Sequence, residues 1–146
     1  MPDNPLRVVV DTNVVLDLLL NREPFVQDAL QVFALGEAGH LELLLSTDAV
    51  TTIFYIVAKN RDAAIAREAV TRLLGLMSLA VLDEPAVLSG LALDFEDVED
   101  AMVAAVAAKS KAWGIVTRNV RDFAGSPVPA MTPQALLAAW GARAGR

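Results

Sequence analysis

The sequence of 146 residues predicts an α/β protein, a three-layer α/β/α sandwich with a mostly parallel sheet of four or five strands. Short β-branched runs alternate with longer segments of helical spacing, which is typical of a parallel sheet covered on both faces. Hydrophobic residues make up 55% of the chain and aromatic residues only 5%, so small aliphatic side chains supply most of the core. The length suits one domain, and we expect a single domain over residues 1–146.

The first half of the chain is expected to begin with a buried strand at residues 7–11, where RVVVD is a β-branched run. Residues 13–20 and 25–38 have helical spacing, and Gly39 is a typical residue after a helix end. The other elements expected in this half are a strand at 43–45, a helix capped within 46–48 and ending at 59, and a helix at 61–76.

The second half is expected to continue the alternation. Residues 78–82 predict a strand, and Pro85, which a helix tolerates in its first turn, precedes a helical segment that ends near residue 93. The run GIVT at 114–117 predicts another strand. The remaining expected elements are a helix from near 97 to 111, a strand at 128–131, and a helix that is capped by Thr132 and runs to 140.

Composition and charge narrow the possible functions. With 18 acidic and 12 basic residues the net charge is −6, which argues against a protein that mainly coats nucleic acid. The charge is compatible with an enzyme that gathers carboxylates around a cation, because the metal reverses the local field. The absence of cysteine excludes disulfides, thiolate metal sites and a catalytic thiol. Residues 1–6 do not resemble a signal peptide and no apolar run reaches about 18 residues, so we expect a soluble, cytoplasmic protein.

The first candidate site residue is Asp11, directly after the first predicted strand. Ligands of parallel α/β sheets bind at the carboxyl ends of the strands. A carboxylate buried there needs a partner or a cation, because burying it alone is costly. Asp11 could instead cap the helix that begins near Asn13. Its position leaves both interpretations open.

A second acidic group lies at the start of the helix predicted near residue 97. The segment 94–100 has five acids in seven residues, whereas capping a helix requires one or two. Asp97 and Asp100 are three residues apart and therefore share a helical face. A cation would relieve their repulsion, and a solvated helix start is the alternative interpretation.

The polar residues TRNVRD at 117–122 form the third group. Taken alone, they could be a loop in which Asn119 or Asp122 caps its own turn. With the aspartates of the other two groups, however, Asp122 would bring to one sheet edge the oxygen ligands that Mg²⁺ and Mn²⁺ prefer. Two such ions about 4 Å apart can activate a water and stabilise the leaving oxygen in phosphodiester cleavage. The single histidine, His40, is expected at the surface.

Two segments resemble the PIN-domain family. RVVVDTNVVLDLLLNREP at 7–24 is similar to the opening of these domains, and DVEDAMVAAVAAKSKAWGIVTRNVRDF at 97–123 is similar to their second half. The segments stand in the family's order, and the resemblance extends over about residues 7–140. It implies a PIN-like fold and a metal-dependent endoribonuclease acting on RNA. It further implies a toxin of a type II toxin–antitoxin pair, with an antitoxin protein as partner.

The resemblance also implies roles for individual residues. The acids that would bind the metal and serve in catalysis are Asp11, Asp97, Asp100 and Asp122, of which Asp97 is auxiliary. The residues that would line or orient these carboxylates are Asn13, Thr52, Thr117 and Asn119. Asn119 is an alternative to Asp122 in the last acidic position. Apart from the resemblance, arginine chemistry suggests that Arg118 or Arg121, which flank Asn119, binds the substrate, either by stabilising the phosphate as charge builds or by holding the RNA.

One position departs from the family's pattern. PIN domains usually carry an acid on the helix after the second strand, where this chain has Thr52. Asp48 is the nearest acid but lies about one helical turn earlier. Mechanisms with two ions, or with one ion and Asp97 compensating, both stay open. A non-catalytic PIN-like binding scaffold is therefore an alternative function.

Another alternative treats Asp11 as a phosphorylated aspartate. A phosphatase of the haloacid dehalogenase type has a second acid two residues further on, where this chain has Asn13. A receiver domain has a lysine after a late strand, where this chain has Arg118. Both departures count against this class.

A homodimer is also expected. The two helices predicted between residues 47 and 76 carry more apolar side chains than one buried stripe needs, and an exposed apolar patch favours self-association. The apolar residues in question are Ile53, Phe54, Ile56, Leu73, Leu74 and Leu76.

Overall fold

The computed structural model describes residues 4–145 and contains a five-stranded sheet in which every pair of neighbouring strands is parallel. The strand order is β3-β2-β1-β4-β5. The strands are β1 (Leu6–Val10), β2 (Leu41–Ser46), β3 (Ser78–Ala80), β4 (Gly114–Val116) and β5 (Ala130–Met131). The α/β class and the parallel sheet expected from the sequence are confirmed.

The last three residues of the central strand, β1, are deeply buried. Val8 pairs with Leu43 of β2, and Val9 pairs with Ile115 of β4. The side chains of Val8, Val9 and Val10 are at most 1% exposed. Strands covered on both faces have apolar residues at successive positions, and the valine run of β1 therefore suits the middle of a parallel sheet.

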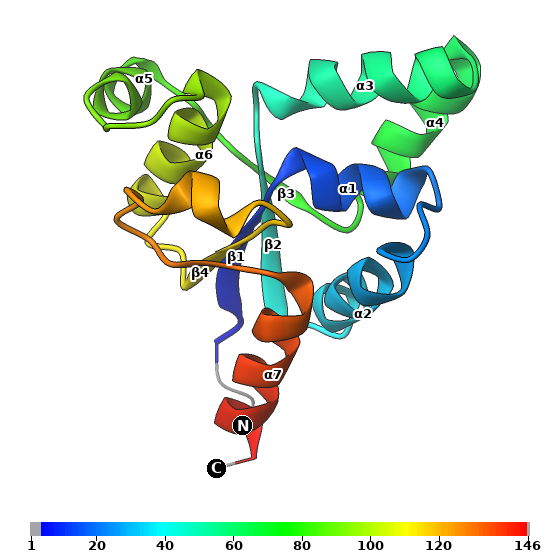
Figure 1. Cartoon of the computed structure of the whole chain (residues 1–146). Helices are drawn as coiled ribbons and strands as arrows, with labels where there is room; N and C mark the ends of the chain where they lie inside the picture. The colour runs from blue at the N-terminus through cyan, green and yellow to red at the C-terminus, as the bar shows by residue number, and fades with distance from the viewer. Residues whose placement is uncertain (1–3, 146) are drawn as a thin grey trace.

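Helices cover both faces of this sheet. The helices are α1 (Thr12–Leu19), α2 (Val26–Glu37), α3 (Ala49–Asn60), α4 (Ala63–Leu73), α5 (Glu84–Leu91), α6 (Val98–Lys109) and α7 (Pro133–Ala144). Figure 1 shows α5 and α6 on one side of the strands and α1, α2, α3, α4 and α7 on the other. None of the helices within residues 4–145 is long and apolar enough to cross a membrane.

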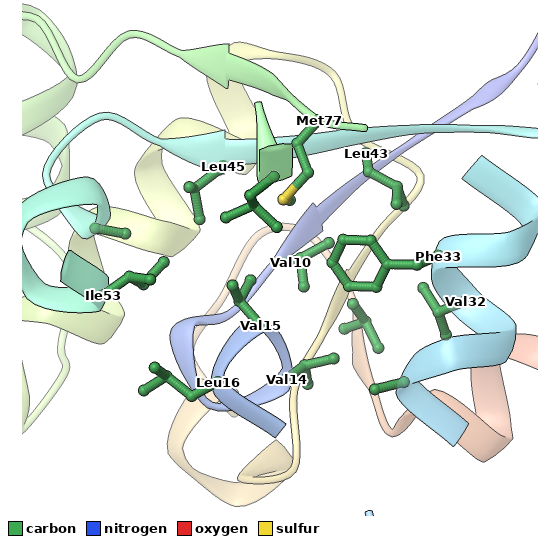
Figure 2. Packing of buried hydrophobic residues seen from close by; sticks show 14 of the residues in the cluster. Val10, Val14, Val15, Leu16, Val32, Phe33, Leu43, Leu45, Ile53 and Met77 are labelled. Atoms are coloured by element: carbon green, nitrogen blue, oxygen red, sulfur yellow. The ribbon is translucent and has the colours of Figure 1, made fainter. Parts of the chain in front are cut away.

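The two layers of helices bury two separate hydrophobic cores. On the side of α1, Val10 packs with Phe33 of α2, Ile53 of α3 and Met77 (Figure 2). On the side of α6, a second cluster contains Val9 in place of Val10. Successive side chains of a strand point to opposite faces, and alternate residues of β1 therefore fill the two cores.

Helix α6 lies between the sheet and α5. All seven residues from 101 to 107 are buried, because this helix is covered on two sides. A Cβ on Gly90 of α5 would lie 3.1 Å from the backbone oxygen of Ala101 and 2.8 Å from Cε of Met102. The two helices can therefore pack this closely because residue 90 has no side chain.

Every predicted helix and strand is present, with ends shifted by at most four residues. Helices α4 and α6 begin later than a simple apolar pattern suggests, because Asp62 and Asp97 occupy their N-cap positions, whereas α1 begins at Thr12, directly after its N-cap Asp11. The segment after β4 contains a short 3₁₀ helix, η1 (Val120–Phe123), that the sequence analysis treated as a loop. Phe123 is buried in the core below α6, and this anchors the turn.

The carboxyl ends of β1 and β4 place two polar residues side by side. Val10 pairs with Val116, and the backbone N–H of Asp11 donates to the carbonyl oxygen of Val116 at 2.9 Å. Asp11 and Thr117 therefore leave the sheet as neighbours, although they are 106 positions apart. This edge carries the candidate site.

Candidate metal centre

Asp11 is a buried carboxylate surrounded by hydrogen-bond donors. It is 7% exposed. Its Oδ1 accepts a hydrogen bond from the backbone N–H of Thr12 at 2.9 Å. Its Oδ2 accepts from the hydroxyl of Thr117 at 2.7 Å and from Nδ2 of Asn13 at 3.4 Å. Asp11 is thus the N-cap of α1 as well as a fixed acid at the edge of the sheet.

The segment after β4 is held against the start of α1 by further hydrogen bonds. The backbone N–H of Arg118 donates to Oδ1 of Asn13 at 3.3 Å. The backbone N–H of Asn119 donates to the hydroxyl oxygen of Thr117 at 3.0 Å, and that hydroxyl donates to Asp11. Asn13 and Thr117 therefore orient the Asp11 carboxylate by hydrogen bonds, while Asn119 contributes through its backbone.

The acids at the start of α6 face Asp11 and Asp122. The pKa of the half-buried Asp100 is raised to about 7. Burial is the largest cause, and the nearby charges of Asp11, Asp97, Asp122 and Glu99 add to it, in this order. Both burial and uncompensated negative charge nearby favour the protonated form of a carboxyl group. The acids from three distant segments therefore share one electrostatic neighbourhood.

The pKa of Asp11 is also raised above its ordinary value. Burial is the main cause, and the hydrogen bonds from Thr117 and Thr12 oppose it. The charges of Asp97 and Asp122 raise the pKa further. Asp11 and Asp100 are therefore both more readily charged in the presence of a cation than in its absence.

An open cavity of about 550 Å³ lies over the acids of α6 and η1. Its lining residues are Asp94, Phe95, Glu96, Asp97, Asp100, Arg121, Asp122, Ala124 and Gly125. Arg121 is the only basic residue among them. The cavity therefore combines a strongly negative wall with one guanidinium group.

A much smaller cavity, of about 20 Å³, lies beside Asp11. Thr52 lines it, so the position at which the family usually has an acid does face the site. Asp48 and Glu99 line the same cavity. Glu99 was not singled out from the sequence, because nothing in a run of five acids shows which of them faces Asp11. Its four-residue spacing from Val103, another lining residue, is the only sequence signal.

Arg118 is separated from these acids by its own ion pair. Its Nε and Nη2 donate to the two carboxylate oxygens of Asp17 at 2.7 and 3.1 Å. Its guanidinium carbon lies 4.0 Å from the ring centroid of Phe25. Asp17 is 1% exposed and has a second cation, Arg22, at 3.7 Å. The structure thus separates the two arginines that the sequence analysis grouped, because only Arg121 lines the acidic cavity.

His40 lies far from this edge. It immediately precedes β2, at the amino end of that strand, and is exposed. Its ring centroid lies 5.1 Å from that of Trp140 in α7. The expected surface position of His40 is confirmed. Because it lies at the amino end of β2, His40 cannot act as a base at the carboxyl edge of the sheet.

The residues at this edge suit a hard divalent cation in their chemistry. They offer carboxylate oxygens, the ligands preferred by Mg²⁺ and Mn²⁺, in a field that positive charge would relieve. Among residues 4–145, no three acidic or histidine side chains already stand as ligands of one ion. Ligation would therefore require exposed carboxylates such as Asp97 and Asp122 to turn towards Asp11 and Asp100.

Comparisons with known proteins agree with this fold. The PIN-domain profile matches residues 7–121. The chain is 23% identical over 142 residues to Ribonuclease VapC1 of Aquifex aeolicus (strain VF5), covering 94% of this chain and 97% of that protein.

Solved structures of toxin–antitoxin complexes share the fold. The DNA-bound VapBC complex from Salmonella typhimurium superposes with a TM-score of 0.70 at 18% identity, over 88% of this chain and 98% of that chain. VapBC2 from Rickettsia felis, bound to a fragment of promoter DNA, superposes with a TM-score of 0.69 at 14% identity, over 87% of this chain and 98% of that chain. The profile match spans most of the chain: it contains β2, β3, β4 and all but the first residue of β1, and it ends within η1, before β5. This chain belongs to the PIN-domain family.

Proposed function

We propose that this chain is a metal-dependent endoribonuclease. The observation that carries the proposal is the gathering of Asp11, Asp97, Asp100 and Asp122 around one edge, where burial and the neighbouring acids together raise the pKa of Asp100 to about 7. The similarity to a protein named as a ribonuclease supports the reaction class. The family match leaves the aspartyl-phosphate alternatives without support.

In this proposal the four aspartates have different roles. Asp11 is the fixed ligand of Mg²⁺ or Mn²⁺, because both its oxygens are already oriented by hydrogen bonds. Asp100 faces it from α6, while the exposed Asp97 and Asp122 complete the ligand set. A bound divalent ion would supply Lewis acidity and an activated water for phosphodiester hydrolysis.

The substrate contact is assigned to Arg121. Its guanidinium group lines the acidic cavity, is exposed, and can form two parallel hydrogen bonds with a phosphate. The guanidinium of Arg118 already binds both oxygens of Asp17 and is less suited to this role. The acidic wall would repel RNA until a cation is bound, so that metal and substrate binding should be coupled.

We also propose that the chain is the toxin of a toxin–antitoxin pair and acts in the cytoplasm. The support is the shared fold with the VapBC complexes of Salmonella and Rickettsia. The test is to co-express the chain with a small protein encoded beside its gene. Co-purification and loss of RNA cleavage in the complex are expected. If the chain still cleaves RNA at its full rate in the presence of each protein encoded beside its gene, the toxin assignment is wrong.

Self-association is proposed through α3 and α4. Of the apolar residues expected to form the patch, Ile53 and Leu73 are buried, while Leu74 and Leu76 are exposed. Tyr55, 69% exposed, and Ile65 add to the exposed apolar area on these helices. Sedimentation should show a dimer at tens of micromolar for the wild type and a monomer for Leu76→Glu. A monomeric wild type would remove the idea.

The reaction is tested with a fluorescent single-stranded RNA. The wild type should cleave it with Mn²⁺ and not in excess chelator. Asp100→Asn should lower the rate by about 100-fold, as much as the loss of a group that supports a metal ligand can cost, while Glu37→Gln on α2 should leave it unchanged. Equal cleavage in chelator would overturn the metal mechanism. No cleavage with any divalent ion would favour the non-catalytic scaffold.

A further inference from the structure

The small cavity beside Asp11 is separate from the open acidic cavity. The two have no lining residue in common. Its volume of about 20 Å³ is just above the 10–15 Å³ or so that one water-sized particle requires. The lining residues are Asp11, Thr12, Asp48, Ala49, Thr52, Glu99 and Val103.

The first turn of α6 presents carboxylates to both cavities. Asp97 and Asp100, three residues apart, line the open cavity. Glu99 and Val103, four residues apart, share a different face and line the small one. The acidic run therefore lines both cavities, and Glu99 is its member in the small cavity that Asp11 also lines.

The opposite wall of the small cavity comes from the start of α3 and offers little free charge. Thr52 has a hydroxyl where a carboxylate would fit the neighbourhood of a cation. Asp48 accepts a hydrogen bond from the hydroxyl of Ser46, which already orients its carboxylate. Glu99, by contrast, forms no ion pair with any residue of the described chain, 4–145.

We infer that Glu99 supplies, from α6, the carboxylate that Thr52 does not provide from α3, and that it ligates or orients the cation on this side of Asp11. The inference rests on the proposed metal site. It explains why the first turn of α6 carries more acids than capping needs: Asp97 caps the helix, while Asp100 and Glu99 face different cavities.

The test measures Mn²⁺ binding directly, by calorimetry and by electron paramagnetic resonance, without RNA. Glu99→Gln should weaken Mn²⁺ binding by about tenfold or remove one bound ion, as expected for a ligand or its partner. Glu84→Gln is the matched control, since Glu84 also lies in the first turn of a helix but outside both cavities. Adding Thr52→Glu to Glu99→Gln should restore binding, because it returns a carboxylate to the same cavity.

Several outcomes would overturn this assignment. Unchanged Mn²⁺ binding in Glu99→Gln, with binding lost in Asp11→Asn, would remove Glu99 and leave the proposed function intact. A wild type that binds no Mn²⁺ would remove both. Equal weakening of Mn²⁺ binding by Glu84→Gln would show that the effect comes from overall negative charge and not from the position of Glu99. Without metal, Glu99→Gln should melt no earlier than the wild type, which excludes an effect through loss of folding.

Discussion

Two buried aspartates, Asp11 at the N-cap of α1 and Asp17 within α1, have opposite surroundings. They are six positions apart and only 7% and 1% exposed. Asp17 is paired with Arg118 at 2.7 Å and has Arg22 within 4 Å. Asp11 has hydrogen-bond donors but acidic neighbours, and its pKa is raised.

This difference distinguishes a structural charge from a functional one. The charge of Asp17 is balanced within the chain, so that losing a partner should destabilise the fold. The charge of Asp11 is not balanced by any residue in contact with it, and its cluster should gain from an external cation. Mutations at the two sites should therefore separate stability from activity.

The largest expected effect on stability is at the Asp17 pair. Arg118→Ala leaves a buried carboxylate with only the more distant Arg22, and should lower the free energy of unfolding by about 3 kcal/mol. Arg121→Ala, an exposed arginine of the same segment, should change it by less than about 0.5 kcal/mol. Urea denaturation of both variants makes the comparison. Equal stability of the two would contradict the structural role of Arg118.

A smaller effect, on activity, is expected at Asp97. Asp97 and Asp62 both cap helices by accepting a hydrogen bond from a backbone N–H three residues ahead, and asparagine can do the same. Asp97→Asn should slow Mn²⁺-dependent RNA cleavage by about tenfold, whereas Asp62→Asn should not. Equal rates in the two variants would show that Asp97 is only a cap.

The smallest effect is a pH dependence of stability without metal. The pKa of Asp100 is about 7 in the folded chain and 3.8 ordinarily, so that the folded state holds a proton that the unfolded chain releases. The contribution of Asp100 is therefore full below about pH 4 and is lost as the pH rises through about 7. The melting temperature of Asp100→Asn relative to wild type should rise by a few degrees between about pH 5 and 8. A melting-temperature difference that stays constant across this pH range would contradict the raised pKa of Asp100.

Much of the fold could be predicted from local patterns. The valine run of β1 and the GIV run of β4 identify buried strands, because parallel strands covered on both faces are apolar throughout. The rule that ligands bind at the carboxyl ends of such strands then drew attention to Asp11 and to the residues after β4. The ends of helices were less predictable, because several depend on which aspartate becomes the cap.

The role of Asp17 could not be predicted in the same way. Its helix reads TNVVLDLL, and one acid in an apolar run does not reveal a partner that is 101 positions away in sequence. The separate uses of Arg118 and Arg121 follow from that pairing and from η1, which the sequence did not indicate. Long-range charge pairing has no local pattern, and it therefore required the structure.

The most direct test of the account is Asp11→Asn, with RNA cleavage in Mn²⁺ measured beside thermal melting without metal. The account predicts that cleavage falls by about 100-fold or more. It also predicts that the melting temperature stays the same or rises, because the raised pKa of Asp11 means that its folded environment disfavours the charge. Cleavage at the parent rate would contradict the carboxylate-held metal, and a much earlier melt would show that Asp11 is chiefly a structural cap.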